Sequence, residues 1–268
     1  MFLLSIFSDY SWFTILSLIV LCFAAGFVDS VIGGGGLIQL PAMLINFPTT
    51  PLPVIFGTNK IASLAGTSMA AVQYAKRIQF NFKILLLVAA FAGAASFAGA
   101  RVVNHINVNA LKPVLLVILI VIAIYTFIKK DLGKVRAKHI SATQQLVRGA
   151  AMGIVVGFYD GFFGPGTGSF FVLGFVMLLG FEFVEASAYA KLVNCMTNIT
   201  ALFVFISQGK FILEIAILMA VCNVAGNIIG AGIALRKGNG FVRIFFLIIV
   251  LVMIVRYGYD IWKAYMLP

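Results

Sequence analysis

Charged residues are scarce in this chain, and carboxylates are the scarcest of them. Only 10% of the 268 residues are charged, with 8 Asp and Glu against 19 Lys and Arg, while 62% are hydrophobic. A soluble domain carries about 25% charged and about 45–50% apolar residues. The mean hydropathy of +1.11 therefore excludes a soluble globular protein, because no shape of this size hides so much apolar surface.

Other absences exclude several kinds of site. The three cysteines, Cys22, Cys195 and Cys222, are isolated in apolar segments and form neither a CxxC pair nor a metal-ligand spacing. The glycine tracts follow no strand and lack the Lys-Ser/Thr ending of a phosphate-binding loop. The net charge of +11 lies mostly in short loops, which is typical of loops retained on the cytoplasmic side of a membrane. We therefore predict no metal, no cofactor and no nucleic-acid partner.

Long apolar segments dominate what is present. A membrane-spanning helix needs about 20 apolar residues, with a range of about 17–25. We predict an all-α polytopic membrane protein with 8–10 membrane segments, two of which are short, broken or re-entrant half-helices. The segments are 11–31, 37–47, 57–75, 84–103, 111–128, 145–163, 169–183, 187–206, 211–235 and 241–265, the second and seventh being the short ones.

An internal repeat relates the two halves of the chain at an offset of 131 residues. Asp29 matches Asp160 at this offset, and Lys60 matches Lys191. Because such residues are rare inside apolar segments, their shared spacing predicts two homologous transmembrane repeats, a common architecture among transporters. The predicted units are a first repeat at 1–130, a basic linker at 131–139 and a second repeat at 140–268.

Basic residues in the loops predict the orientation. The loops 76–83, 129–148 and 236–243 carry three, six and three Lys or Arg residues. They share one side if all ten segments cross, whereas the last loop changes sides if the two short segments are re-entrant. The positive-inside rule places the linker in the cytoplasm in either case. The rule leaves open whether the repeats are inverted or parallel.

Two glycine-rich breaks, Gly33–Gly36 and Gly164–Gly168, follow the two aspartates. Each glycine costs a helix about 1 kcal/mol relative to alanine, and proline costs about 3 kcal/mol. Irregular backbone at membrane depth persists only where it is buried in protein or lines an aqueous cavity. The N–H groups that begin the next helix suit an anion, although close helix packing is an alternative use of the glycines. The candidate substrate-binding residues here are Gly33, Gly34, Gly35, Gly36, Gly164, Gly166, Thr167 and Gly168.

A polar stripe follows each break. Lys60, Ser63 and Thr67 fall on one face of a predicted helix, at spacings of three and four residues. A lysine near the bilayer centre costs about 2.5–3.5 kcal/mol on insertion scales, so it should face a cavity or a partner unless it snorkels to the interface. The corresponding candidates in the second half are Lys191, Asn194 and Asn198.

The aspartates Asp29 and Asp160 have two candidate roles. Each could take up a proton during transport, or each could act structurally as an ion-pair partner or a cap for the broken helix. Two membrane aspartates that share a proton would instead indicate an intramembrane aspartyl protease. The glycine pattern around them is wrong for that class, so we predict that the protein is not an enzyme.

The paired motifs resemble a known family. GFVDSVIGGGGLIQLP and GFYDGFFGPGTGSFF, each followed by a lysine-bearing segment (GTNK and AYAKLVNCMTN), look like those of the TauE/SafE sulfite-exporter-like permeases, over nearly the whole chain. The resemblance implies a multi-pass protein of the bacterial inner membrane that moves sulfur-containing anions. The two motifs are not identical, because the second has Gly164-Pro165-Gly166-Thr167-Gly168 where the first has four glycines. The two half-sites need not be equivalent.

Together these features predict a secondary transporter that exports a small sulfur-containing anion, such as sulfite or an organosulfonate. Alternating access between the two repeats is the expected mechanism. An anion channel with the same charged constriction is the main alternative. The expected partners are the small anion and the lipid bilayer, with homo-oligomerisation left open.

Overall fold

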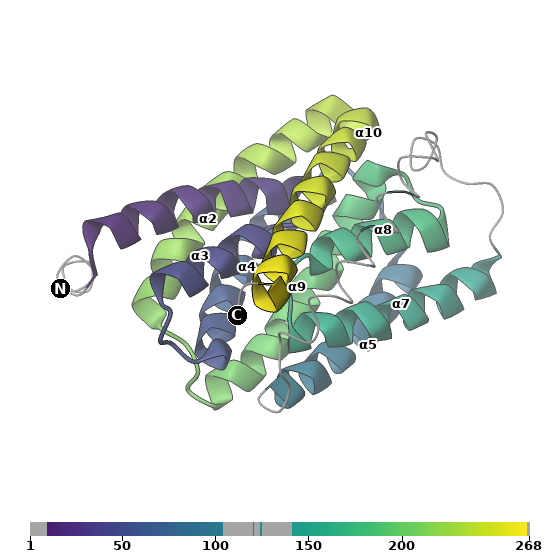
Figure 1. Ribbon diagram of the computed structural model, residues 1–268. Helices are drawn as coiled ribbons and strands as arrows, with labels where there is room; N and C mark the ends of the chain where they lie inside the picture. Colours follow the sequence, from purple (N-terminus) through teal and green to yellow (C-terminus); the bar gives the residue numbers. More distant parts are fainter. Residues whose placement is uncertain (1–9, 104–119, 121–123, 125–140, 267–268) are drawn as a thin grey trace.

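The computed structural model describes residues 10–103, 120, 124 and 141–266, and the regular elements among them are all helices (Figure 1). This confirms the all-α prediction for the described part of the chain. The predicted linker at 131–139 and most of the segment predicted at 111–128 lie outside the described residues. The helices are α2 (Trp12–Ile32), α3 (Gly36–Asn46), α4 (Leu52–Ala75), α5 (Phe82–Val102), α7 (Ala142–Phe162), α8 (Thr167–Leu179), α9 (Phe183–Ser207) and α10 (Leu213–Met266).

Local sequence explains where several helices begin and end. The side-chain oxygens of Ser11, Asn81 and Ser141 accept hydrogen bonds from backbone N–H groups in the first turns of α2, α5 and α7. Such N-caps satisfy donors that a helix start leaves without partners. At the other end, α2 and α8 stop at Gly33 and Gly180, both in the left-handed conformation that glycine adopts without steric cost.

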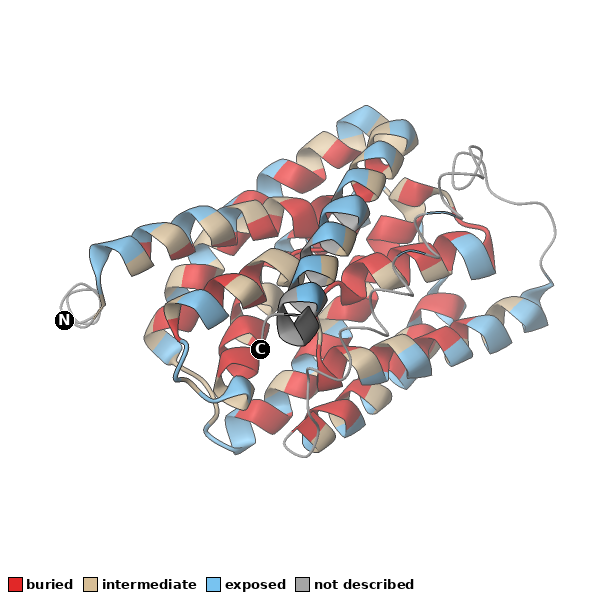
Figure 2. Ribbon diagram, in the orientation of Figure 1, coloured by how far each residue is buried: buried red, intermediate tan, exposed pale blue. Residues whose placement is uncertain are grey.

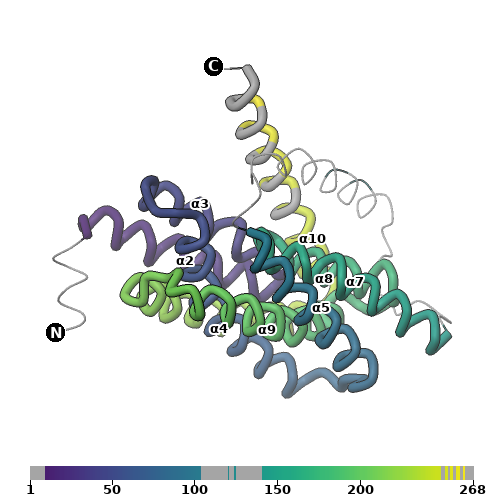
Figure 3. Tube along the Cα trace, turned by 90° about the horizontal axis from the view of Figure 1, so that it is seen from below, coloured from purple at the N-terminus to yellow at the C-terminus, as the bar shows by residue number. Residues whose placement is uncertain are grey.

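Four of the described helices are long and apolar enough to cross a membrane: α2, α5, α9 and the Leu213–Ile248 part of α10. The two segments predicted to be short are short, since α3 has 11 residues and α8 has 13. The boundary predicted between the ninth and tenth segments is a kink within α10 at Gly238, where φ is 71° and ψ is −165°. Beyond this kink, α10 first packs on the core through Phe245 against Phe27 and Phe246 against Phe183, and its later turns project away from the other described helices (Figure 3).

Each glycine break folds the chain back on itself. α2 and the shorter α3 form one hairpin, where the Ser17 hydroxyl donates to Oδ1 of Asn46 (3.1 Å). α7 and α8 form another, where the Arg148 guanidinium donates to the carbonyl oxygen of Leu178 (3.2 Å). The two hairpins point in opposite directions (Figure 1), so they enter the molecule from opposite ends.

The long helices exchange partners between the two halves of the chain. α5 packs along α7, α10 packs along α2, and α4 packs against α9 between them. Glycine permits both close approaches: a Cβ at Gly157 would overlap the backbone of Ala92, and a Cβ at Gly26 would overlap that of Asn223. Ala92 and Asn223 are themselves 131 residues apart, so the two interfaces match at the spacing of the motifs.

Basic residues from two of the predicted loops gather at one end of the molecule. Lys76 and Arg77, which follow α4, line a surface pocket together with Arg236, near the kink of α10. These two basic loops therefore lie on the same side of the molecule, which agrees with the count in which all ten segments cross. The remaining basic loop falls largely in the undescribed part of the chain.

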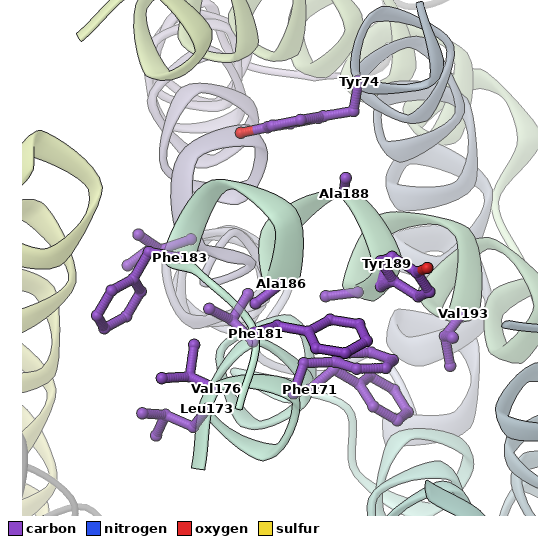
Figure 4. Packing of buried hydrophobic residues seen from close by; sticks show 14 of the residues in the cluster. Tyr74, Phe171, Leu173, Val176, Phe181, Phe183, Ala186, Ala188, Tyr189 and Val193 are labelled. Atoms are coloured by element: carbon purple, nitrogen blue, oxygen red, sulfur yellow. The ribbon is translucent and has the colours of Figure 1, made fainter. Parts of the chain in front are cut away.

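The surface and the core have the distribution expected in a bilayer. Large apolar side chains are exposed along the outer faces of the helices (Figure 2), for example Trp12, Phe13 and Val155 at 72%, 76% and 69% exposure. A soluble monomer rarely exposes such continuous apolar surface. Inside, the ring of Phe175 stacks on that of Phe181. Tyr189 packs edge-on against Phe181 where α8 turns into α9 (Figure 4), and this aromatic cluster fixes the start of the helix that carries Lys191.

Candidate functional site

The two glycine breaks meet at the centre of the molecule. The Ser169 N–H donates to the carbonyl oxygen of Gly33 (3.2 Å), and a Cβ at either Gly33 or Gly168 would overlap the backbone of the other. Gly33, Gly164 and Gly166 also have φ values of 82°, 92° and 79°, in the region that other residues rarely adopt. The glycines are thus required both for the bend of each hairpin and for the contact between the hairpins.

Some backbone N–H groups at the breaks already form hydrogen bonds within the protein. The N–H groups of Leu37 and Ile38 donate to the carbonyl oxygens of Gly34 and Gly35 (both 3.1 Å), and Ser169 is engaged as described above. Fewer backbone N–H groups at the helix starts are therefore available to a ligand than the sequence predicted. Only the backbone that faces the central cavity is placed to meet one.

The rare charged residues pair across the two halves of the chain. Lys60 on α4 donates to Oδ2 of Asp160 at the end of α7, with an N–O distance of 2.7 Å. Lys191 on α9 donates to Oδ2 of Asp29 at the end of α2, at 3.0 Å, and also to the carbonyl oxygen of Asp29. Each lysine of one half therefore neutralises the aspartate of the other half. Such pairing compensates charges that would be costly to bury alone.

The four charged side chains are withdrawn from the surface. Lys60 and Asp160 are 5% and 2% exposed, while Lys191 and Asp29 are 0% and 7% exposed. The Thr67 hydroxyl donates a further hydrogen bond to Oδ2 of Asp29 (3.0 Å). The two pairs therefore hold the crossing of α4 and α9 to the ends of the two hairpins.

A small central cavity of about 30 Å³ lies where the breaks and the ion pairs meet. A cavity needs roughly 10–15 Å³ on this measure to hold one water molecule, so this one holds about two. Its wall combines charged groups, amides and hydroxyls with exposed glycine backbone. The predicted site residues in that wall are Asp29, Gly33, Gly36, Lys60, Ser63, Thr67, Asp160, Gly164, Gly166, Gly168, Asn194 and Asn198.

Four predicted site residues are outside the cavity wall. Gly34, Gly35, Thr167 and Lys191 do not line it. The Thr167 hydroxyl instead donates to the carbonyl oxygen of Gly164 (2.7 Å), which fixes the second break. Helical spacing could not separate Lys191 from Lys60, because both occupy the same position in their stripes and only the packing of α2 decides which one faces the cavity.

The wall also contains four residues absent from the predicted set: Leu40, Phe56, Asn59 and Phe163. Phe56 lies one helical turn before Lys60, so the spacing that selected Ser63 and Thr67 would have found it. Asn59 is 6% exposed, and its Oδ1 has no hydrogen-bond partner within the described structure. Phe163 packs edge-to-face against Phe56, and it could not be located without the tertiary structure.

A layer of amides supports the cavity from behind. The Gln39 side-chain oxygen accepts hydrogen bonds from Ser63 (3.4 Å) and from Asn223 of α10 (3.3 Å). Gln39 thereby ties α3 to helices from both halves of the chain. Among the described residues, no three His, Cys, Asp or Glu side chains come together as a metal site would require.

The fold and the site together define a class of protein. Apolar helices that span the bilayer surround a central cavity with buried ion pairs, and intramembrane charges of this kind mark substrate or ion pathways. The chain is accordingly a multi-pass membrane protein of the transporter class.

Comparison with known proteins makes the family specific. The family model of the sulfite exporter TauE/SafE matches residues 18–257. The chain belongs to this family, which confirms the resemblance seen in the motifs. A comparison with solved structures finds no match.

Several bacterial proteins are similar along most of their length. The probable membrane transporter protein ORF9 of Sinorhizobium sp. is 37% identical over 249 residues, which cover 92% of this chain and 94% of that protein. The probable membrane transporter protein YfcA of Escherichia coli K12 is 33% identical, with 88% of this chain and 86% of that protein covered. A probable membrane transporter protein of Haemophilus influenzae is 30% identical, with 89% and 92% covered.

Proposed function

We propose that this protein is a secondary transporter that exports a small sulfur-containing anion, such as sulfite or an organosulfonate, from the bacterial cytoplasm. The observation that carries the proposal is the meeting of two glycine breaks and two lysine–aspartate pairs around one central cavity. Lys60 supplies a positive group in the cavity wall beside exposed glycine backbone, and these groups can bind an anion. The family to which the chain belongs narrows the anion to one that contains sulfur.

Two inverted repeats account for the arrangement. The hairpins α2–α3 and α7–α8 point in opposite directions, and the interfaces of Gly26 with Asn223 and of Gly157 with Ala92 match at the repeat spacing. Inverted repeats with a site at their interface support alternating access, because one repeat can rock against the other around a fixed site. The cytoplasmic linker predicted at 131–139 would join the two.

The size of the cavity supports a moving mechanism over a static pore. Space for about two water molecules is too small for a sulfonate together with its hydrogen-bond partners. The hairpins and the crossing helices must therefore separate before an anion enters. An anion channel would instead need a continuous open path through the protein. Single-channel currents in place of saturable flux would favour that alternative.

The charge balance supports export driven by the membrane potential. The empty site holds two lysines and two aspartates, so it is formally neutral. With an anion bound, the loaded site carries the charge of the anion, and an inside-negative potential of 100 mV then favours outward movement by about 2.3 kcal/mol per charge. The empty site returns without opposing that potential. If an aspartate takes up a proton during the cycle, flux will also depend on pH.

The pairing of the aspartates argues against the protease alternative. A proteolytic dyad needs two carboxylates that share one proton, whereas Asp29 and Asp160 are each bound to a lysine of the other half. Cleavage of a membrane peptide that is lost in Asp29→Asn would nevertheless restore that alternative.

Flux into or out of proteoliposomes tests the proposed function. Purified protein should move labelled sulfite or a labelled sulfonate with saturable kinetics, counter-flow and acceleration by an imposed potential. Lys60→Met should abolish this flux, while Lys237→Met, at an exposed position on α10, serves as the matched control. Equal flux in the Lys60→Met variant and the wild type would refute the site. Absence of saturable flux for every sulfur anion would refute the substrate class.

A further inference from the structure

We propose that the two buried ion pairs have different tasks: Lys60 leaves Asp160 to bind the transported anion, whereas Lys191 and Asp29 stay joined as a structural brace. The inference rests on the proposed transport function and refines it. It reduces the candidate anion-binding cations from two to one, although both lysines hold the same position in the repeat.

The surroundings of Lys191 are those of a fixed group. Its side chain is fully buried and does not line the cavity. The ammonium group binds two acceptors on one residue, the carboxylate and the carbonyl oxygen of Asp29. That carbonyl also accepts the N–H of Gly33 (2.6 Å), so Lys191 binds the backbone at the point where α2 ends and the first break begins. An anion could reach Lys191 only by displacing both of these acceptors.

Asp29 lines the cavity, but it is constrained as Lys191 is. Its Oδ2 accepts hydrogen bonds from both Lys191 and Thr67, so the carboxylate already has two donors on two different helices. Releasing Lys191 would break an ion pair and leave the end of α2 without its cross-link to α9. The pair therefore joins the first hairpin to the central crossing, and it maintains the geometry in which the breaks meet.

The surroundings of Lys60 are those of an exchangeable group. Within the described residues its ammonium has one partner, Oδ2 of Asp160, and both side chains line the cavity. A Cβ at Gly164 would lie 3.7 Å from Nζ of Lys60 and 3.8 Å from Oδ1 of Asp160, so the pair lies directly beside the second break. An anion in the cavity can take the place of the Asp160 carboxylate at Lys60 without disturbing any backbone hydrogen bond.

Asn59 adds a side-chain amide beside Lys60 that can form a further hydrogen bond. The side chain lines the cavity one residue before Lys60, and its buried Oδ1 is without a hydrogen-bond partner within the described structure. A buried amide oxygen without a partner is costly, and a half-turn of the amide places its NH₂ group there instead. Asn59 can therefore donate to an anion held by Lys60, or accept from one that carries a proton. The Lys191 side of the cavity lacks an equivalent, since the matching residue is Ala190.

Charge-neutral double variants separate the two tasks, because they remove a pair without leaving one charge buried. The variants are Lys60→Gln with Asp160→Asn, and Lys191→Gln with Asp29→Asn. Thermal unfolding of the purified full chain in detergent is measured with and without sulfite and methanesulfonate, with chloride as the ionic control. Flux of the same anions into proteoliposomes is measured in parallel.

The inference predicts opposite outcomes for the two variants. Without Lys60 and Asp160, the unfolding temperature should stay near that of the wild type, while apparent affinity for the anion should fall by about tenfold or more, the value of a hydrogen bond to a charged group. Without Lys191 and Asp29, the unfolding temperature should fall by several degrees, while the folded fraction should keep its stabilisation by the anion.

Two results would overturn the inference. One is anion stabilisation that is retained without Lys60 and Asp160, and the other is anion stabilisation that is lost without Lys191 and Asp29 in a protein that unfolds at the wild-type temperature. A wild type that responds to no sulfur anion would instead refute the proposed substrate class. The unfolding temperatures of the two variants test the brace in either case.

Discussion

The two glycine breaks make similar bends with different backbone conformations. The first break has one left-handed glycine, Gly33, because Gly35 is right-handed. The second has two, Gly164 and Gly166, the latter at the position that matches Gly35. The backbone conformation of the duplicated positions is therefore not identical.

Side chains reinforce the second break. In both breaks backbone N–H groups bind glycine carbonyl oxygens, and in the second the N–H of Thr167 binds that of Gly164 (3.2 Å). The Thr167 hydroxyl also binds the carbonyl oxygen of Gly164, and the Tyr159 hydroxyl binds that of Pro165 (2.6 Å).

The same asymmetry holds for the ion pairs. Lys191 binds both the carboxylate and the backbone carbonyl of Asp29, and Thr67 binds the same carboxylate. Both members of the pair between Lys60 and Asp160 line the cavity, whereas Asp29 alone of the other pair does so. The cross-linked pair lies beside the four-glycine break, and the exchangeable pair lies beside the break that side-chain hydroxyls also hold.

The largest expected effect comes from filling the contact between the breaks. Gly168→Ala places a methyl group into the backbone of Gly33, and because backbone cannot give way as a side chain does, we expect a loss of about 3 kcal/mol or more in stability. Thermal unfolding and monodispersity in detergent measure it. Gly232→Ala is the matched control, since this helical position has nothing within 4 Å of the added Cβ. Equal stability of the two variants would contradict the contact.

The next effect sharpens the difference between the aspartates. Asp160→Asn removes the competing carboxylate from Lys60, so the apparent affinity for the anion should rise by about tenfold while the maximal flux falls because release slows. Asp29→Asn also removes a carboxylate from the cavity wall, but it should tighten anion binding less, because the lysine that it would release, Lys191, is outside that wall. Concentration dependence of flux in proteoliposomes distinguishes these results. Equal tightening in the two variants would show that the two sides are equivalent.

A smaller effect tests how the second break is held. Tyr159→Phe removes the hydroxyl that binds the carbonyl oxygen of Pro165, and the typical net value of such a bond predicts a loss of about 1 kcal/mol in stability. The position that matches Tyr159 in the first repeat is Val28, which has no hydroxyl to lose. Thermal unfolding beside Tyr259→Phe, a half-exposed tyrosine on α10, provides the comparison. An unchanged unfolding temperature in Tyr159→Phe would show that the second break does not depend on this bond.

The smallest effect tests whether all four glycines of the first break are needed. A Cβ at Gly36 would meet its nearest neighbour, Cα of Pro165, at 3.4 Å, and the matching residue in the second repeat is Thr167. Gly36→Ala should therefore change stability by no more than about 0.5 kcal/mol. Gly33→Ala, at φ 82° and against the backbone of Gly168, should be far worse in the same unfolding assay. Comparable losses in both would mean that the glycine run acts as a whole.

Much of this protein could be predicted from residue types and spacings alone. Composition and apolar segment length indicate a helical membrane protein, because a bilayer core of fixed thickness requires apolar helices of a matching length. Glycine and proline placed the breaks through their cost in a helix. Rarity singled out Asp29, Asp160, Lys60 and Lys191, since charge in an apolar segment needs a partner. Of the sixteen residues that line the cavity, most were found in this way.

Tertiary structure decided what depends on the direction and crossing of helices. Spacing along one helix cannot show which lysine pairs with which aspartate. Each lysine pairs with the aspartate of the other half because the two hairpins enter the molecule from opposite ends. Spacing also cannot separate Lys60 from Lys191, because the end of α2 covers one and leaves the other beside the cavity. The sequence by itself determined the kinds of group in the site. Packing decided which of them face one another, since burial is a property of neighbours and not of a residue's place in the chain.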